Sequence, residues 1–285
     1  MEALSFSEPE CIWNGRAVLG EGPFWSEAGQ ALFWVDIKAP AIYRHDPASR
    51  TTMHWPMPEA IGCLIEDGPD RFIAALKSGF AYITLGQVGH APAITAIADP
   101  ESGKPQNRFN DGKRAPDGSI WAGSMDDTET GVSGQWWRLS PGGEVSLLED
   151  AAFKVTNGPA FDAGRDRVFL TDSAAQIIYV ADLLDNGRGY ANRTPFVQFG
   201  RGDGYPDGMT VAPDGSLWVA FWDGACIRRF APDGALLQTV PVPARRPTSV
   251  CWSPDQRKLY VTSASIGLKP GGLDGGVFCL EVLAT

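Results

Sequence analysis

The chain has 285 residues, 44% of them hydrophobic, which is enough for a large core, and its formal net charge at pH 7 is −10. This acidic balance, without any run of basic residues, argues against nucleic acid and anionic membrane surfaces as partners. No apolar stretch approaches the roughly 18 residues that span a bilayer, and the start MEALSFSEPE lacks the basic and apolar regions of a secretory signal, so we expect a cytoplasmic protein.

One unit, a turn followed by a short apolar strand, recurs six times along the chain. Its copies occupy residues 24–37, 64–77, 113–124, 161–172, 211–222 and 252–263. Their apolar strands begin 40 to 49 residues apart, at Leu32, Phe72, Ile120, Val168, Leu217 and Leu259. Six units at this period are typical of a β-propeller with four strands in each blade. We therefore predict an all-β fold, with residues 1–285 forming a single six-bladed β-propeller domain.

The two ends of the chain are expected to close the ring. The sixth unit reaches the C-terminus after only three strands, the last of them GGVFCLEVL. Residues 4–13 (LSFSEPECIW) precede the first unit and are strand-like in part. Because an unfinished blade leaves an unpaired sheet edge, this N-terminal segment is predicted to supply the outer strand of the last blade.

The tripeptide Pro-Asp-Gly occurs twice between residues 204 and 218, in two different settings. Pro213-Asp214-Gly215 falls in the hairpin between the first and second strands of its blade. There proline presets φ, aspartate hydrogen-bonds its own backbone and glycine takes the positive φ. In the other copy, Asp207 lies ten residues before Leu217, in the loop that enters the strand nearest the axis.

Four blades carry a polar residue at that same point, followed directly or one residue later by glycine: Glu21, Asn110, Asn157 and Asp207. The radial arrangement makes these side chains converge. Two carboxylates that meet without a cation repel each other, whereas two carboxylates with two amide oxygens suit a hard ion such as Ca²⁺, Mg²⁺ or Mn²⁺. The alternative is ordinary turn formation, because Asp-Gly and Asn-Gly favour turns. The shared register across four blades favours the cation site.

The motifs LGEGPFW, RFNDGK, WAGSM, TNGPAF and YPDGMTV resemble those of the gluconolactonase/regucalcin family, a group of senescence-marker-protein-like lactonases, over nearly the whole chain. The resemblance implies a six-bladed propeller that hydrolyses a sugar lactone to its aldonic acid with one divalent cation. The cation is Ca²⁺ by first choice, with Mg²⁺, Mn²⁺, Zn²⁺ and Fe²⁺ as alternatives. The resemblance also implies metal ligation by Glu21, Asn157 and Asp207, and substrate-facing roles for Arg108 and Asn110.

The mechanism that this family suggests is a hypothesis at this point. The cation polarises the lactone carbonyl, Asp207 acts as the general base on the attacking water, and Arg108 donates hydrogen bonds to the substrate. Two differences from the family motifs leave the identity of the sugar lactone undetermined. Ala115 stands where members often carry an acidic residue, and the stretch DDTETGVSG after WAGSM does not identify a substrate-contacting acid.

Loops between the second and third strands emerge on the face that carries the converging residues. The first and last of them are long and rich in glycine and are expected to form lids that set selectivity. These loops are 124–135, 171–176, 221–226 and 263–276. In them, Trp222 is a candidate for stacking on a sugar or for core packing, and Asp172 for supporting the metal ligands or for forming a turn.

Two other functions stay open. A phosphotriesterase or fluorophosphatase would use a similar cation site on phosphorus, and a non-catalytic calcium-binding propeller would use the cation for structure alone. Serine hydrolase chemistry is disfavoured because no G-x-S-x-G motif occurs and no histidine lies near the converging loops. A scaffolding WD40 protein is disfavoured because GH…WD repeats are absent.

Overall fold

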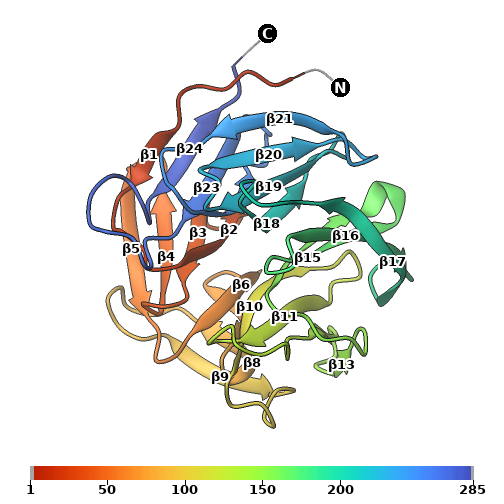
Figure 1. The fold of residues 1–285 in the computed structure, drawn as a ribbon. Helices are drawn as coiled ribbons and strands as arrows, with labels where there is room; N and C mark the ends of the chain where they lie inside the picture. The colour runs from red at the N-terminus through yellow and green to blue at the C-terminus, as the bar shows by residue number, and fades with distance from the viewer. Residues whose placement is uncertain (1–2, 284–285) are drawn as a thin grey trace.

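The computed structural model describes residues 3–283 and consists almost entirely of β-strands. Over that range the strands pair into six four-stranded sheets, which stand around a common centre as the blades of a propeller (Figure 1). The predicted all-β, six-bladed β-propeller with four-stranded blades is confirmed. Within the described range there is no helix with the length and hydrophobicity of a membrane span.

The first five blades each use four strands that are consecutive in sequence and follow one another from the axis outwards. Blade 1 contains β2 (Gly20–Ser26), β3 (Ala31–Asp36), β4 (Ala41–Asp46) and β5 (Thr51–Pro56). Blade 2 contains β6 (Ile61–Gly68), β7 (Arg71–Leu76), β8 (Gly79–Thr84) and β9 (Ala93–Ala98). Blade 3 contains β10 (Asn107–Arg114), β11 (Ile120–Asp126), β12 (Trp136–Leu139) and β13 (Val145–Leu147). Blade 4 contains β14 (Thr156–Asp162), β15 (Arg167–Asp172), β16 (Ile177–Leu184) and β17 (Gly189–Gln198), with a short 3₁₀ turn at Ala163–Arg165. Blade 5 contains β18 (Tyr205–Val211), β19 (Leu217–Trp222), β20 (Cys226–Phe230) and β21 (Leu236–Pro241).

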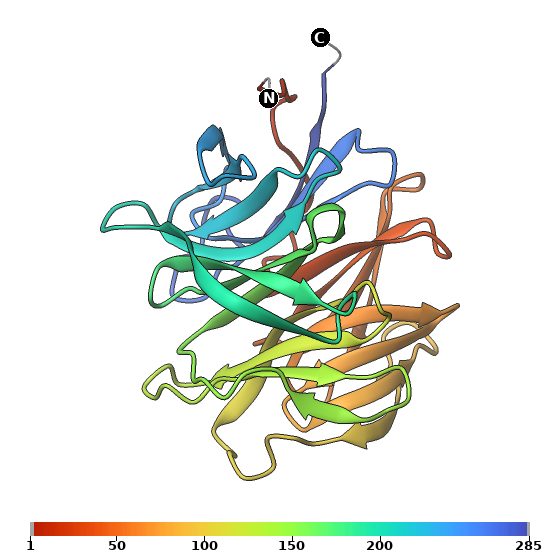
Figure 2. The same ribbon diagram turned by 90° about the vertical axis from the view of Figure 1, so that its right-hand side faces the viewer.

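The last blade combines both ends of the chain. It contains β22 (Pro247–Trp252), β23 (Lys258–Ser263) and β24 (Val277–Glu281), and β1 (Glu10–Trp13) pairs antiparallel with β24 as its outermost strand. Figures 1 and 2 show the N-terminal segment running beside the C-terminal strand at one edge of the ring. The segment continues this contact through a bridge between Phe6 and Val282. The predicted ring closure by residues 4–13 is confirmed.

The repeating unit read from the sequence corresponds to the second strand of each blade. All six residues chosen as strand starts lie at or next to the beginning of such a strand, and each is at most 2% exposed. The hairpin before β19 also matches its prediction: Asp214 Oδ1 accepts hydrogen bonds from the backbone N of Ser216 at 2.8 Å and from its Oγ at 2.7 Å. Gly215 has a φ of 83°. This copy of Pro-Asp-Gly is a structural turn.

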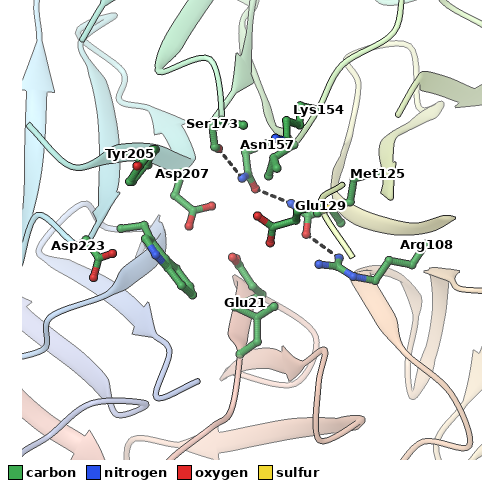
Figure 3. Close-up of a pocket in the computed structure, with 15 residues that line it drawn as sticks. Glu21, Arg108, Met125, Glu129, Lys154, Asn157, Ser173, Tyr205, Asp207 and Asp223 are labelled. Atoms are coloured by element: carbon green, nitrogen blue, oxygen red, sulfur yellow. Dashed lines mark hydrogen bonds between the residues drawn. The ribbon is translucent and has the colours of Figure 1, made fainter. Parts of the chain in front are cut away.

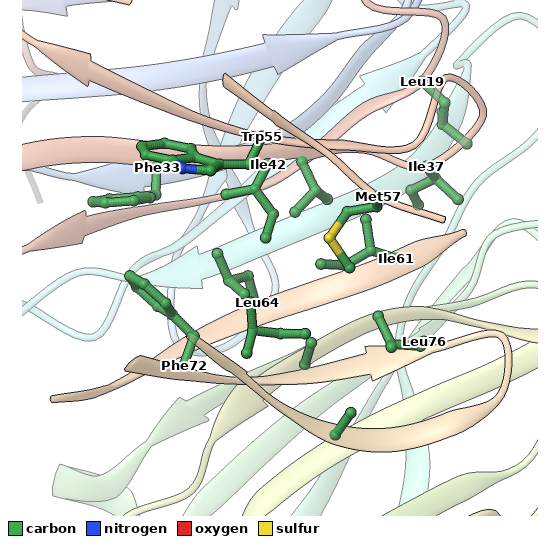
Figure 4. Packing of buried hydrophobic residues seen from close by; sticks show 14 of the residues in the cluster. Leu19, Phe33, Ile37, Ile42, Trp55, Met57, Ile61, Leu64, Phe72 and Leu76 are labelled. Carbon is green, nitrogen blue, oxygen red and sulfur yellow. The ribbon is translucent and has the colours of Figure 1, made fainter. Parts of the chain in front are cut away.

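The hydrophobic core lies between the faces of neighbouring blades. Figure 4 shows one such layer, in which Phe33 and Trp55 of blade 1 meet Leu64 and Phe72 of blade 2. Full burial of a side chain of this size stabilises the fold by about 1.5–3 kcal/mol. Because the first strands of adjacent blades also contact one another, these layers hold β2, β6, β10, β14, β18 and β22 around the axis.

Candidate functional site

A pocket of about 470 Å³ lies at one end of the ring. Blades 1, 3, 4 and 5 supply its walls, and it contains all five site residues predicted from the sequence: Glu21, Arg108, Asn110, Asn157 and Asp207. Figure 3 shows Glu21, Asn157 and Asp207 pointing toward its centre from three different blades. The structure therefore brings together side chains that are up to 186 positions apart in the chain.

The converging residues do not lie in loops that enter the inner strands, as the sequence predicted; they lie within those strands. Glu21 is in β2, Asn110 in β10, Asn157 in β14 and Asp207 in β18. Each sits at or beside an irregularity in the pairing with the next strand, where one residue is added. A β-bulge of this kind turns a side chain out of the regular alternation. The prediction failed because periodicity does not reveal a bulge.

Glycine follows these residues because the inner strands crowd together at the axis. A Cβ on Gly208, directly after Asp207, would lie 2.2 Å from the Oγ of Ser249 in the neighbouring blade. Gly158, directly after Asn157, has a φ of 92°, a conformation that strongly favours glycine. Both positions therefore require glycine for the adjacent polar side chain to be held where it is.

The two carboxylates in the pocket are buried, with Glu21 3% and Asp207 6% exposed. Burial raises the pKa of Glu21 well above its usual value, and the carboxylates of Asp207 and Asp111 raise it further. Burial likewise raises the pKa of Asp207, followed by the effect of Asp111 and, more weakly, of Glu129. Each accepts a hydrogen bond from the backbone N of its following glycine, at 3.1 Å for Glu21 and 3.0 Å for Asp207. Neither forms an ion pair with a lysine or arginine of residues 3–283.

This donor set fits a hard divalent cation. Two buried carboxylates without a cationic partner repel each other, and a bound cation would offset that repulsion. Among the described residues, no three His, Cys, Asp or Glu side chains are grouped so that they could hold a metal ion. An ion here would consequently need the amide oxygen of Asn157 as well as the carboxylates of Glu21 and Asp207, and such an all-oxygen set is typical of Ca²⁺.

A chain of hydrogen bonds orients the amide of Asn157. Its Nδ2 donates to Ser173 Oγ at 2.8 Å, and its Oδ1 accepts from Asn110 Nδ2 at 3.0 Å. Ser173 in turn donates to the carbonyl oxygen of Pro206 at 2.6 Å, directly before Asp207. The dashed lines in Figure 3 trace part of this network. The amide of Asn157 is therefore held directly by blade 3 and is linked to blade 5 through Ser173 of its own blade.

Arg108 and Asn110 lie side by side in the wall of the pocket. The Nη1 of Arg108 donates to Asn110 Oδ1 at 2.6 Å, and its Nε donates to Asp127. Arg108 is only 3% exposed, so its guanidinium is fixed on the side of Asp127, which also receives a hydrogen bond from Lys38 Nζ at 2.6 Å. Since the Oδ1 of Asn110 already accepts from Arg108, this residue supports Asn157 and Arg108 in the present arrangement.

The pocket contains residues that the sequence did not identify. Glu129, from the stretch DDTETGVSG, points into it, and Lys154 and Tyr205 line its rim (Figure 3). Only Tyr205 had a signal in the sequence, because it begins the motif YPDGMTV. The other two follow from loop conformation, which no periodic pattern predicts. Lys154 has no carboxylate within ion-pair distance among residues 3–283.

Trp222 and Asp172, for which the sequence left two roles each, have different surroundings in the structure. Trp222 lines the pocket, and the guanidinium of Arg246 lies 4.6 Å from the centre of its ring. Asp172 accepts hydrogen bonds from the backbone N of Lys154 at 3.0 Å and of Val155 and Ala175 at 3.3 Å. Asp172 therefore forms turns, and one of these fixes the backbone that leads to Asn157.

The four loops expected at this face contribute unequally. Residues 124–135, 171–176 and 221–226 each supply lining residues, whereas 263–276 supplies none, so its expected role as a lid is not supported. Ala115, which stands where family members often carry an acidic residue, does not line the pocket either. It is buried in a hydrophobic cluster between blades 3 and 4. Of the two loops expected to form lids, only 124–135 therefore reaches the pocket.

Comparisons with known proteins place the chain in a family and agree with its fold. The family model described as the SMP-30/Gluconolactonase/LRE-like region matches residues 19–265. A 6-deoxy-6-sulfogluconolactonase of Pseudomonas putida is 33% identical over 258 residues, covering 90% of this chain and 86% of the relative. An L-arabinolactonase of Azospirillum brasilense is 32% identical, covering 93% and 89%. The solved structure of a luciferin-regenerating enzyme superposes with a TM-score of 0.91 at 28% identity, covering 98% of this chain and 96% of that one.

Proposed function

The chain belongs to the SMP-30/gluconolactonase/LRE-like family, and from this premise we propose that it hydrolyses a sugar lactone to the corresponding aldonic acid. Relatives named as lactonases, which cover about nine tenths of the chain at 32–33% identity, support this reaction. The observation that carries the proposal is the pair of buried carboxylates, Glu21 and Asp207, which converge with Asn157 in a pocket with room for a sugar lactone.

In this proposal Glu21, Asn157 and Asp207 hold one divalent cation. Ca²⁺ is the first choice because all the available donors are oxygens, and Mg²⁺, Mn²⁺, Zn²⁺ or Fe²⁺ are the alternatives. When bound, such an ion polarises the ester carbonyl and stabilises the negative charge that develops on its oxygen. The hydrogen bonds from Asn110 and to Ser173 keep the amide of Asn157 in place for that purpose.

Asp207 is the proposed general base. Its carboxylate takes a proton from the water that attacks the carbonyl carbon, and the bond from that carbon to the ring oxygen then breaks. The ring oxygen receives the proton back, which yields the hydroxy acid. A buried carboxylate that faces the pocket is the type of group that performs such a proton transfer.

Arg108 and Asn110 are proposed to face the substrate. The guanidinium of Arg108 is held by Asp127 and Asn110, so it can donate to a lactone oxygen without losing conformational freedom on binding. Trp222 and Tyr205 line the other side of the pocket and offer apolar rings to a sugar face.

A chelation experiment tests the cation and the substrate class together. Protein freed of metal is given Ca²⁺, Mg²⁺, Mn²⁺, Zn²⁺ or Fe²⁺ singly, and acid release is followed on pentonolactones, hexonolactones and an organophosphate. The panel includes a sulfonated lactone, because Lys154 at the rim offers a positive charge without a carboxylate partner among residues 3–283. We expect turnover of a lactone that is lost with chelator and restored by Ca²⁺. Hydrolysis of the organophosphate alone would favour the phosphotriesterase, and cation-dependent stability without turnover would favour the binding propeller.

A further inference from the structure

A second cavity, of about 570 Å³, lies beyond the inner strands from the pocket. Asp111 and Lys113 of β10 line it, whereas Asn110, the residue before Asp111, lines the pocket. Because successive side chains of a strand point to opposite sides, these consecutive residues serve the two cavities. Asp111 and Lys113 thus lie behind the residues that face the pocket.

Asp111 reaches the strand that carries Asn157. It is 1% exposed, and its Oδ2 accepts a hydrogen bond from the backbone N of Gly158 at 2.9 Å. Its Oδ1 accepts another from the backbone N of Gly112 at 2.7 Å. Because Gly158 directly follows Asn157, the carboxylate of Asp111 fixes the backbone at the base of that amide side chain.

Lys113 crosses the axis to the strand that carries Asp207. Its Nζ donates a hydrogen bond to the carbonyl oxygen of Met209 in β18, two residues after Asp207. From a single strand, β10, two side chains therefore reach the backbones of two other blades, each within two residues of a proposed ligand. No carboxylate lies within ion-pair distance of Lys113 among residues 3–283, so the contact to Met209 is its principal anchor.

We propose that Asp111 and Lys113 are positioning residues, which set the distance between Asn157 and Asp207 and thereby the affinity of the site for its cation. This inference rests on the proposed function, because it presupposes that Glu21, Asn157 and Asp207 bind a cation. Neither residue contacts the ion or the substrate; each acts through the backbone next to a ligand.

Electrostatics and positioning make opposite predictions for Lys113. If the lysine acts only as a positive charge near the cation, its removal relieves repulsion and the cation binds more tightly. If it positions Asp207 through Met209, its removal weakens binding. Supporting residues of this kind typically change metal affinity by about 10–100-fold.

The experiment measures Ca²⁺ affinity by calorimetry, and Tb³⁺ binding by luminescence, on the full chain. The variants are Lys113→Met, which keeps the length of the side chain without its donor, Lys113→Arg, which keeps a donor, and Asp111→Asn. Arg138→Met is the matched control, since it breaks a partly buried contact to Asp117 at 2.6 Å in the same blade but away from the axis. Circular dichroism of each variant establishes that it is folded.

We expect Lys113→Met and Asp111→Asn to lose about tenfold or more in Ca²⁺ affinity, with Lys113→Arg nearer the parental value and Arg138→Met unchanged. At saturating Ca²⁺ the KM for the lactone should stay at the parental value. Parental or tighter Ca²⁺ binding by folded Lys113→Met would overturn the inference, as would an equal loss in Arg138→Met. A parental protein that binds neither ion would overturn the proposed cation site, and the positioning role with it.

Discussion

The tripeptide Pro-Asp-Gly occurs twice, and its two aspartates, Asp207 and Asp214, differ in their chemistry because their surroundings differ. Asp214 is 41% exposed at its side chain, bonds to Ser216 and pairs with Arg229 at 2.6 Å, and these hydrogen bonds lower its pKa. Asp207 is buried beside other carboxylates and its pKa is raised. The first is stabilised in its charged form in a turn, whereas burial disfavours the charged form of the second, which lines a pocket.

Replacing each of these aspartates by alanine separates the two roles. We expect Asp207→Ala to lower kcat by about 10²–10⁴-fold, because a general base is lost, and to weaken Ca²⁺ binding while the propeller stays folded. Lactone turnover and calorimetry on the folded variant measure both effects. A metal-loaded Asp207→Ala protein that turns over lactones at the parental rate would show that the proposed role is wrong.

Asp214→Ala is the matched control for that experiment. It removes hydrogen bonds in a hairpin on the far side of the strand from the pocket, so the free energy of unfolding should fall by about 1–2 kcal/mol. Turnover at 25 °C and Ca²⁺ affinity should be retained. If both variants lose activity to the same extent, the loss is explained by damage to the fold of blade 5 and not by removal of a general base at Asp207.

At the scale of elements, the inner strands do two tasks at once. They surround the axis, and the irregularities in their pairing turn polar side chains toward it, as at Asn110 between Phe109 and Asp111. The outer strands do neither, and more of their side chains are exposed. The outer strand of the last blade, β1, differs from the others in one respect: it is remote in sequence from β24, with which it pairs.

Deletion of residues 1–13 should destabilise the whole ring. It removes β1 and exposes the edge of β24, and it removes Phe6, whose ring lies 5.6 Å from that of Trp218 and 6.3 Å from that of Trp252. Thermal unfolding followed by circular dichroism measures the loss. The single variant Phe6→Ala should lower the melting temperature less than the deletion, and a deletion without effect would refute a closing role for the segment.

For the whole molecule, the candidate site joins blades 1, 4 and 5, so binding of the proposed cation should stabilise the ring. A ligand that binds only the folded state at 100 times its Kd adds about 2.7 kcal/mol to the free energy of unfolding. Chelation should therefore lower the melting temperature, and Ca²⁺ should restore it in a concentration-dependent way.

Without the cation, the free energy of unfolding depends on pH through Glu21 and Asp207, in a defined direction. At low pH, Glu21 and Asp207 are protonated in both the folded and the unfolded chain. Because their pKa values are raised in the folded state, the unfolded chain ionises first as pH rises, and the free energy of unfolding falls until pH passes the folded pKa values. The contribution of these two carboxylates to the stability of cation-free protein should thus fall from about pH 4 upwards.

Thermal unfolding at several pH values, with chelator and with Ca²⁺, measures this dependence. The matched variant carries Glu21→Gln and Asp207→Asn and should lose less stability over the same range, because neither side chain then ionises. An identical pH dependence in the parental protein and this variant without the cation would show that Glu21 and Asp207 do not have raised pKa values in the folded state.

The sequence by itself determined the blade number, the strand content, the ring closure and the identity of the converging residues. These properties depend on local patterns that repeat along the chain: an apolar strand must be buried, and a polar residue followed by glycine recurs at one point of four blades. Six copies of the pattern, from Leu32 to Leu259, define the period of the repeat. The last unit has only three strands, so residues 4–13 were predicted to supply its fourth.

Only the tertiary structure decided how those residues are held. That Glu21, Asn157 and Asp207 sit within strands, that Glu129 and Lys154 enter the pocket, and that 263–276 stays out of it could not be predicted from periodicity. The physical reason is that a bulge depends on pairing with a partner strand and a loop on what it packs against. Contacts such as that of Asp111 with Gly158 join residues that come together only once neighbouring blades have packed against each other.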